Sequence, residues 1–580
     1  MRPAPYALSS VTAALALAGA LTGVLSGCTK KTSPPAAPKT EVSSTSSTPA
    51  APHDAGIAWK QATREADVDA AFELAKAENK PVFMYWGAKW CPPCNQVKAT
   101  LFNRQDFIER SRAFVPVYVD GDTPGAQKIG ARYKVAGYPT MVLFNPQGAE
   151  LTRLPGEVDA AQYTEVLTLG MNAQRPVKDV LRLALAETKV NVAGGSPSAG
   201  PPQAGLIPSG DRPRYAAGEG SSLTANDWRL LAFYSWDTDE KQLVAADAVP
   251  DLLKQLADAC PVDQADTAAR LRLKALAAID EKSAAPPADA ATRSKVLALL
   301  ADPARSRSVM DVLTNSAAEL ARALSAKGTP ERAKVLAALG SALQRLETDA
   351  TLSRADRMTA LVAQVELARI DAAKDAKVTL PEPLLTRVRE HTARADREIV
   401  DGYERQAVIT TAAYLLGRSG VPDEADALLQ ANLAKSHSPY YLMSSLASNA
   451  KKRGDTEAAL RWSEQAFDKS EGPATRLQWG ASYVGMMLDL APTDEARIER
   501  AVAQMLTEAD ASSNAFYERS ARSLQKVGTR LQAWNDQGAH AAALKRLQAQ
   551  LDGVCGKLDA ADPQRATCEG LLKTAPKTRA

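Results

Sequence analysis

The sequence predicts a two-part protein, a small α/β domain followed by an all-α solenoid. Between residues 57 and 173, short apolar runs typical of strands alternate with segments of helical periodicity. From residue 224 to residue 575 strand signals are absent, and Ala, Leu, Arg and Glu dominate. The chain has 580 residues, too many for one hydrophobic core, so separate domains are expected.

The α/β part is predicted element by element. Residues 64–80 place Val68, Phe72 and Ala75 on one helical face. Residues 81–87, "PVFMYWG", are almost wholly apolar, as in a strand buried on both faces. The remaining expected elements are strands at 113–120, 139–144 and 149–154 and helices at 93–102, 123–135 and 158–172.

Two cysteines, Cys91 and Cys94, lie where the first strand passes into a helix. A zinc site needs four ligands, but no second C-x-x-C exists and none of the four histidines (His53, His391, His437, His540) is near in sequence. A structural 91–94 disulfide would close too small a loop to stabilise much. The third interpretation is a reactive dithiol. The helix N-terminus, with Lys89 nearby, favours a Cys91 thiolate, and Cys94 can resolve a mixed disulfide.

The element order, the motif "WCPPC" from Trp90 to Cys94 and "VAGYPT" with Pro139 resemble the thioredoxin fold. The runs "NKPVFMYWGAKWCPPC" and "AFVPVYVD" are similar to the C-terminal domain of the disulfide reductase DsbD. The resemblance implies a thiol-disulfide oxidoreductase without a cofactor or metal, with Cys91 and Cys94 as catalytic residues and as the redox disulfide.

The same resemblance implies the substrate-binding residues Trp90, Tyr138 and Pro139. Pro139 in cis would hold the Tyr138 backbone against Cys91, and Trp90 would form a wall of the groove. One position departs from the family, because thioredoxins have a buried Asp where this chain has Tyr85. The partner Lys of the next strand also has no counterpart, so proton transfer at Cys94 must use water or another group. The redox potential and the direction of the reaction stay open.

The N-terminus has the layout of a secretory signal, with Arg2 before an apolar stretch at 7–25. The sequence Leu25-Ser26-Gly27-Cys28 resembles the lipobox of bacterial lipoproteins. It implies a signal peptide at 1–27, lipidation of Cys28 and attachment to the membrane, with the outer membrane of a Gram-negative bacterium favoured by Thr29. An ordinary signal peptide is the alternative. Residues 28–56 are rich in Pro, Ser, Thr and Ala and are expected to form a flexible tether.

The C-terminal part is expected to begin after a connecting helix at 174–189 and a linker at 190–223. Four residue pairs lie 34 apart: Gly420/Gly454, Ala425/Ala459, Ser436/Ser470 and Pro439/Pro473. This period resembles the tetratricopeptide repeat and predicts a helical repeat domain at 224–575. Chance similarity in an Ala-rich helical domain is the alternative. The aromatic residues of this part (Tyr440, Tyr441, Trp462, Trp479, Tyr483) either pack between repeats or line a binding surface.

Three further cysteines remain. In an oxidising compartment Cys555 and Cys568 are expected to form a structural disulfide, with a second redox pair as the alternative. Cys260 is expected to be a small buried hydrophobe. The net charge of +3 gives no basic face for nucleic acid.

These observations favour an envelope thiol-disulfide oxidoreductase that faces the periplasm and is held by a lipid anchor. The helical repeats would bind protein thiol or disulfide clients, and an envelope redox partner would exchange electrons with the dithiol. The linker can span tens of ångströms as a flexible chain, so a client held by the helical repeats would meet Cys91 at a raised effective concentration. The rival hypothesis is a non-catalytic scaffold or binding lipoprotein that uses the helical repeats.

Overall fold

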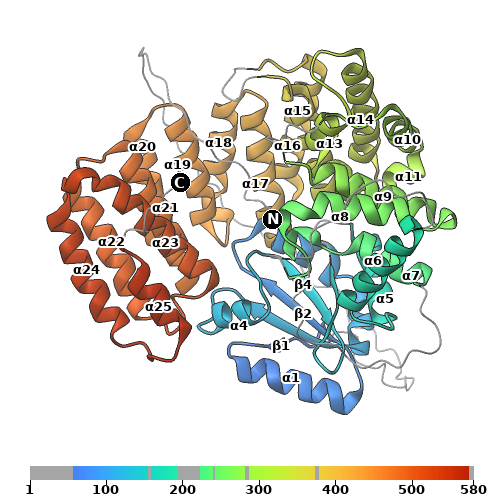
Figure 1. The fold of residues 1–580 in the computed structure, drawn as a ribbon. Coiled ribbons are helices and arrows are strands. Elements are labelled where there is room, and N and C mark those ends of the chain that lie inside the picture. Colours follow the sequence, from blue (N-terminus) through green and yellow to red (C-terminus); the bar gives the residue numbers. More distant parts are fainter. Residues whose placement is uncertain are drawn as a thin grey trace, which may run out of the picture.

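Five strands form one mixed sheet in the order β1-β3-β2-β4-β5 in the computed structural model (Figure 1). The structure describes residues 56–154, 159–193, 223–239, 242–280, 286–372 and 378–573. The expected signal peptide, the expected lipidation site Cys28, residues 28–55 of the tether and residues 194–222 of the linker lie outside this part. The strands are β1 Lys60–Gln61, β2 Val82–Gly87, β3 Val115–Asp120, β4 Thr140–Phe144 and β5 Glu150–Leu154.

The sheet has β1, β3 and β2 parallel and β4 and β5 antiparallel to their neighbours. All six residues of β2 are buried, as the apolar run predicted. On one face Met84 and Trp86 pack under α1 (Glu65–Glu78) and α4 (Ala126–Arg132). On the other face Phe83 and Tyr85 join a core with Phe107 of α3 (Gln105–Arg110) and with α5 (Ala160–Met171). The helix that begins after Cys91 and contains Cys94 is α2 (Pro92–Val97), extended by a π-helical turn η1 (Lys98–Phe102).

The rest of the described chain is helical, which confirms the predicted fold class of an α/β domain followed by an all-α region. Helix α6 continues to residue 193, four residues into the segment that the sequence marked as a linker. The helices are α6 Val177–Ala193, α7 Ala225–Phe233, α8 Val249–Ala259, α9 Ala265–Ala277, α10 Ala290–Ala301, α11 Pro303–Ser308, α12 Met310–Asn315, α13 Ala317–Leu324, α14 Pro330–Thr348, α15 Arg354–Arg369, α16 Glu382–Glu398, α17 Gly402–Arg418, α18 Pro422–Asn432, α19 Pro439–Lys452, α20 Thr456–Lys469, α21 Pro473–Leu490, α22 Glu495–Asp510, α23 Glu518–Trp534, α24 Ala541–Cys555 and α25 Pro563–Gly570. No helix of the described residues has the length and apolarity needed to cross a bilayer.

The 34-residue spacing corresponds to two successive helix pairs, α17–α18 and α19–α20. Gly420 and Gly454 lie in the turns between the helices of each pair, both with positive φ (88° and 78°), a conformation that glycine adopts without strain. Ala425 and Ala459 are fully buried just after these turns. The arrangement is consistent with a tetratricopeptide-like region.

The remaining cysteines lie in the helical region. Cys555 at the end of α24 and Cys568 in α25 form a disulfide whose Cα atoms are 5.7 Å apart. Cys260 is half-buried rather than fully buried, and its Sγ lies 3.8 Å from the carbonyl oxygen of Gln264. Burial raises the pKa of the Cys260 thiol to about 11, so this thiol stays protonated near neutral pH.

The helical region wraps around the α/β domain from the β5 edge to the strand-to-helix turn that holds the cysteines (Figure 1). At the β5 edge the contact centres on Arg153, whose side chain is completely buried. Its guanidinium donates to the Glu150 carboxylate and to the carbonyl oxygens of Tyr133 and Thr238, and Thr238 belongs to the helical region. The Arg153 carbonyl accepts a backbone hydrogen bond of 2.9 Å from Ser235 N. The β5 edge is therefore covered and bonded, not open.

We expect Arg153→Met to lower the free energy of unfolding by about 3–5 kcal/mol, because it leaves the Glu150 carboxylate and several carbonyl oxygens buried without their donor. Arg104→Met is the matched control, since Arg104 forms an exposed pair with Asp106 and its loss should cost less than about 1 kcal/mol. Urea denaturation of both variants measures the difference. Equal destabilisation would contradict the importance of the Arg153 contact.

Candidate active site

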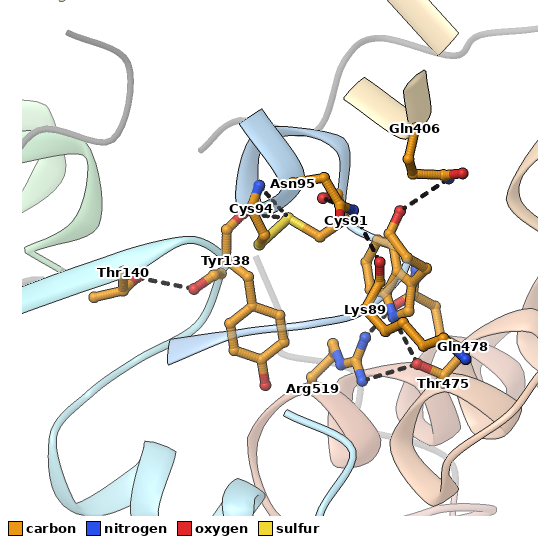
Figure 2. The surroundings of a disulfide bond; sticks show 12 residues. Lys89, Cys91, Cys94, Asn95, Tyr138, Thr140, Gln406, Thr475, Gln478 and Arg519 are labelled. Atoms are coloured by element: carbon orange, nitrogen blue, oxygen red, sulfur yellow. Dashed lines mark hydrogen bonds between the residues drawn. A yellow bond between two sulfur atoms is a disulfide. The ribbon is translucent and has the colours of Figure 1, made fainter. Parts of the chain in front are cut away.

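Cys91 and Cys94 lie where β2 ends and α2 begins, and they are joined by a disulfide with Cα atoms 5.2 Å apart (Figure 2). Cys91 is the N-cap of α2, and its Sγ lies 3.2 Å from the backbone N of Cys94. Pro92 occupies the first helical turn, where its missing N–H costs nothing. The buried amide of Asn95 donates hydrogen bonds of 2.8 Å to the carbonyl oxygens of Lys89 and Cys91, which fixes the turn before the helix.

The Tyr138–Pro139 peptide bond is cis, and the Tyr138 carbonyl oxygen lies 3.6 Å from Cys91 Sγ. The Tyr138 ring packs against Gly121, where a Cβ would collide with it. Its hydroxyl accepts a hydrogen bond of 3.1 Å from Gln127 Nε2. The structure thus brings the sequence-predicted residue Tyr138 beside the cysteine pair (Figure 2), and Pro139 follows it through the cis bond.

Trp90, the third predicted substrate-binding residue, contacts the helical region. Its indole Nε1 donates a 2.7 Å hydrogen bond to Thr475 Oγ1. Its ring stacks on Tyr441 at a centroid distance of 5.9 Å and meets Trp479 edge-on at 5.1 Å. The Arg519 guanidinium lies over the same ring at 5.3 Å. Two of the aromatic residues singled out in the sequence therefore pack against the site and not only between repeats.

The Asp122 cluster (Asp122, Thr475 and Arg519) joins the two parts of the chain next to Trp90. The Asp122 carboxylate accepts hydrogen bonds from Thr475 N (2.8 Å), Thr475 Oγ1 (2.7 Å) and Arg519 Nη2 (3.0 Å). The Arg519 guanidinium also lies 5.2 Å from the centre of the Tyr138 ring, and its backbone N donates to Gln127 Oε1 at 3.0 Å. Sequence reasoning missed these residues, because no local pattern links positions more than 350 residues apart.

The charged groups around the site differ from the sequence expectation. Lys89 forms an ion pair of 3.3 Å with Glu471, so a carboxylate accompanies its positive charge. Lys98, one turn beyond Cys94, has its ammonium within 6 Å of the Tyr118 and Tyr403 rings. Burial lowers the pKa of Lys98.

Two further polar groups lie on the neighbouring strands β2 and β3. Burial raises the pKa of Asp120, which is the register partner of Gly87 at the end of β2. The Tyr85 hydroxyl is buried and has no hydrogen-bond partner among the described residues, and its burial raises the pKa of Tyr85. Tyr85 is therefore a neutral core residue at the position where thioredoxins have a carboxyl group.

Both cysteines of the pair are almost completely buried. Cys91 is 2% exposed and Cys94 is 0% exposed. The low exposure of Cys94 follows from its place in the first turn of α2, whose inner side faces the sheet. Trp90 and Tyr138 flank Cys91, and both contact the helical region.

Comparison with known proteins shows which family the α/β domain resembles. Residues 68–170 match the model of a family described as a thioredoxin-like domain. The thiol:disulfide interchange protein DsbD 1 of Pseudomonas aeruginosa is 31% identical over 113 residues, 19% of this chain and 19% of that protein. The DsbD of Pseudomonas fluorescens is 29% identical over 117 residues, 20% of each chain. The chain thus spans about a fifth of the length of these DsbD relatives.

A shorter relative is matched over most of its length. A thioredoxin-like protein of Synechocystis is 30% identical over 95 residues, which are 16% of this chain and 86% of that protein. The family match at residues 68–170 contains the cysteine pair and Pro139. The chain therefore belongs to the thioredoxin-like family through its α/β domain.

Proposed function

We propose that the protein is a thiol-disulfide oxidoreductase of the bacterial cell envelope that reduces or exchanges disulfides of protein clients through Cys91 and Cys94. The observation that carries the proposal is the position of the cysteine pair, at the N-terminus of α2 and beside the Tyr138 carbonyl. The membership of the thioredoxin-like family and the likeness to DsbD proteins support the same activity.

The geometry supports a two-step exchange. In the reduced protein the Cys91 thiolate, favoured by the N–H groups at the start of α2, attacks one sulfur of a client disulfide. The client S–S bond breaks, a Cys91–client bond forms, and the departing client sulfur takes a proton. Cys94 then loses its proton and attacks Cys91 Sγ, so the client leaves as a dithiol and the Cys91–Cys94 disulfide forms. Two electrons pass to the client, and a dithiol donor of the envelope restores them.

Trp90, Tyr138 and Pro139 are proposed to bind the client. The Tyr138 carbonyl beside Cys91 can accept a hydrogen bond from an extended client segment, as a strand edge does. A client in this position also meets Tyr441 and Trp479 of the helical region, because both rings pack against Trp90. We therefore propose that the helical region takes part in client binding.

Substituting the cysteines one at a time tests the assignment. Cys94→Ala should accumulate mixed disulfides through Cys91, because the resolving thiol is absent. Cys91→Ala should form none, and both variants should reduce insulin no faster than the uncatalysed reaction. Cys260→Ala is the matched control and should behave like the parent, since its thiol is half-buried and far along the chain.

Trapping in cells followed by mass spectrometry also identifies the clients. If mixed disulfides form through Cys94 in preference to Cys91, the two roles are reversed. Full insulin reduction by Cys91→Ala would refute the proposal and favour a non-catalytic scaffold.

The lipobox at residues 25–28 supports a lipid anchor on Cys28, with the folded part in the periplasm and the outer membrane as the site of attachment. Several acyl chains on one residue hold a protein stably, whereas one chain gives only marginal binding. We expect Cys28→Ala to abolish acylation and to leave either the unprocessed precursor or a released protein. Membrane fractionation and the mass of the N-terminal peptide measure this, with Cys260→Ala as control. Mature, acylated Cys28→Ala protein in the membrane fraction would refute the anchor.

A further inference from the structure

The helical region covers the groove in which a client would bind. By this groove we mean the space beside Cys91 that Trp90 and Tyr138 flank. Figure 2 shows Tyr138 next to the cysteine pair. On one side Thr475, Tyr441 and Trp479 hold the Trp90 indole. On the other side the Arg519 guanidinium lies over the Tyr138 ring, and Arg522 donates a 2.6 Å hydrogen bond to the Ala136 carbonyl. These side chains come from α19, α21 and α23, which we call the cover helices.

In this arrangement the dithiol cannot exchange with a protein. A thiolate must reach a sulfur atom directly to attack a disulfide, and a folded partner must place a chain segment beside Tyr138 as well. Cys91 is only 2% exposed and Cys94 is not exposed at all. Exchange therefore requires that the cover helices move away from Trp90 and Tyr138.

The contact between the cover helices and the α/β domain is of a kind that allows the two to separate. It combines the aromatic packing of Trp90 with polar bonds, and its outermost pair, Lys89 and Glu471, keeps 53% and 70% of its side-chain surface exposed. The Asp122 cluster is a more buried polar contact, with 14% of Asp122 and 11% of Arg519 exposed. Relative motion of two domains in one chain is the normal expectation unless their interface is large and hydrophobic, and the polar bonds here can be replaced by bonds to water. The Arg153 contact at the opposite edge can persist during the movement, since it involves other helices.

We propose that the cover helices hold the protein in an autoinhibited state, and that the Asp122 cluster keeps this state closed. A client gains access only when α19, α21 and α23 leave the groove. The proposal rests on the proposed function for its biological meaning, but it concerns access to Cys91 and can be measured without any turnover.

The test is the alkylation rate of reduced Cys91 in the full chain, followed at each cysteine by peptide mass spectrometry. In the closed state the rate equals the fraction of open molecules times the rate for a free thiol. We expect the folded parent to react about 100-fold or more slowly than the unfolded chain. Thr475→Val removes the hydroxyl that bonds Trp90 and Asp122 but keeps the shape of the side chain. It should raise the rate about tenfold, which corresponds to 1.4 kcal/mol of lost closed-state stability. Arg519→Met should act in the same direction.

Matched controls exist elsewhere in the helical region. Thr507→Val changes an exposed threonine of α22, and Arg546→Met changes an exposed arginine of α24 that pairs with Glu499. Both should leave the rate of Cys91 alkylation within about twofold of the parent. Thermal unfolding curves ensure that the faster variants are still folded at the assay temperature.

The outcomes separate the two proposals. If Cys91 of the folded parent reacts as fast as in the unfolded chain, or if the cluster variants match their controls, the autoinhibited state is refuted. If the cluster variants accelerate alkylation but no variant reduces a disulfide or forms a mixed disulfide, the cover is confirmed and the oxidoreductase function fails. If Thr475→Val and Arg519→Met accelerate both alkylation and reduction of a protein disulfide, the cover helices regulate the reaction.

Discussion

The arrangement of the whole chain depends on the packing of one indole, that of Trp90, between two parts of the protein. Trp90 directly precedes Cys91, and its backbone belongs to the turn that Asn95 fixes. Its ring is a partly buried member of the hydrophobic core that spans α19 to α25. Because the turn is rigid and the ring is held by Thr475, Tyr441 and Trp479, the position of the helical region relative to the cysteine pair is fixed through this residue.

Two of the contacts between the helical region and the α/β domain differ in physical character. At the β5 edge, the charge of Arg153 is completely removed from water and fully bonded, so separating this contact would strand several buried polar groups. At the active site, the bonds of the Asp122 cluster join side chains that water can reach once the helices move. The first contact suits a permanent attachment and the second a separable one. A single chain can therefore keep its two parts together while it opens one of them.

Much of the α/β domain could be predicted from the sequence, because its signals are local. The apolar run of β2, the spacing of Cys91 and Cys94 and the position of Pro139 follow from short stretches of sequence. Strand β1 was missed because two residues carry no period. The contact between the domains was missed for a different reason. Asp122 and Thr475 are 353 positions apart, and no local sequence pattern indicates that two such distant residues are in contact.

The helical region also takes part in the electrostatics of the site. Thioredoxins place a buried acid where this chain has Tyr85, and the charged residue nearest to Cys94 along the chain is Lys98. Asp120 lies at the end of β3, where it is the register partner of Gly87. The ammonium of Lys98 lies between Tyr118 of the sheet and Tyr403 of α17, and burial disfavours its charge. Burial likewise disfavours the charge of Asp120. Where thioredoxins have one buried acid, this chain has Tyr85 together with two titratable groups, Lys98 and Asp120. One of them, Lys98, contacts Tyr403 of α17, a helix outside the thioredoxin-like domain. The surroundings of the dithiol therefore include side chains of the helical region as well as those of the α/β domain.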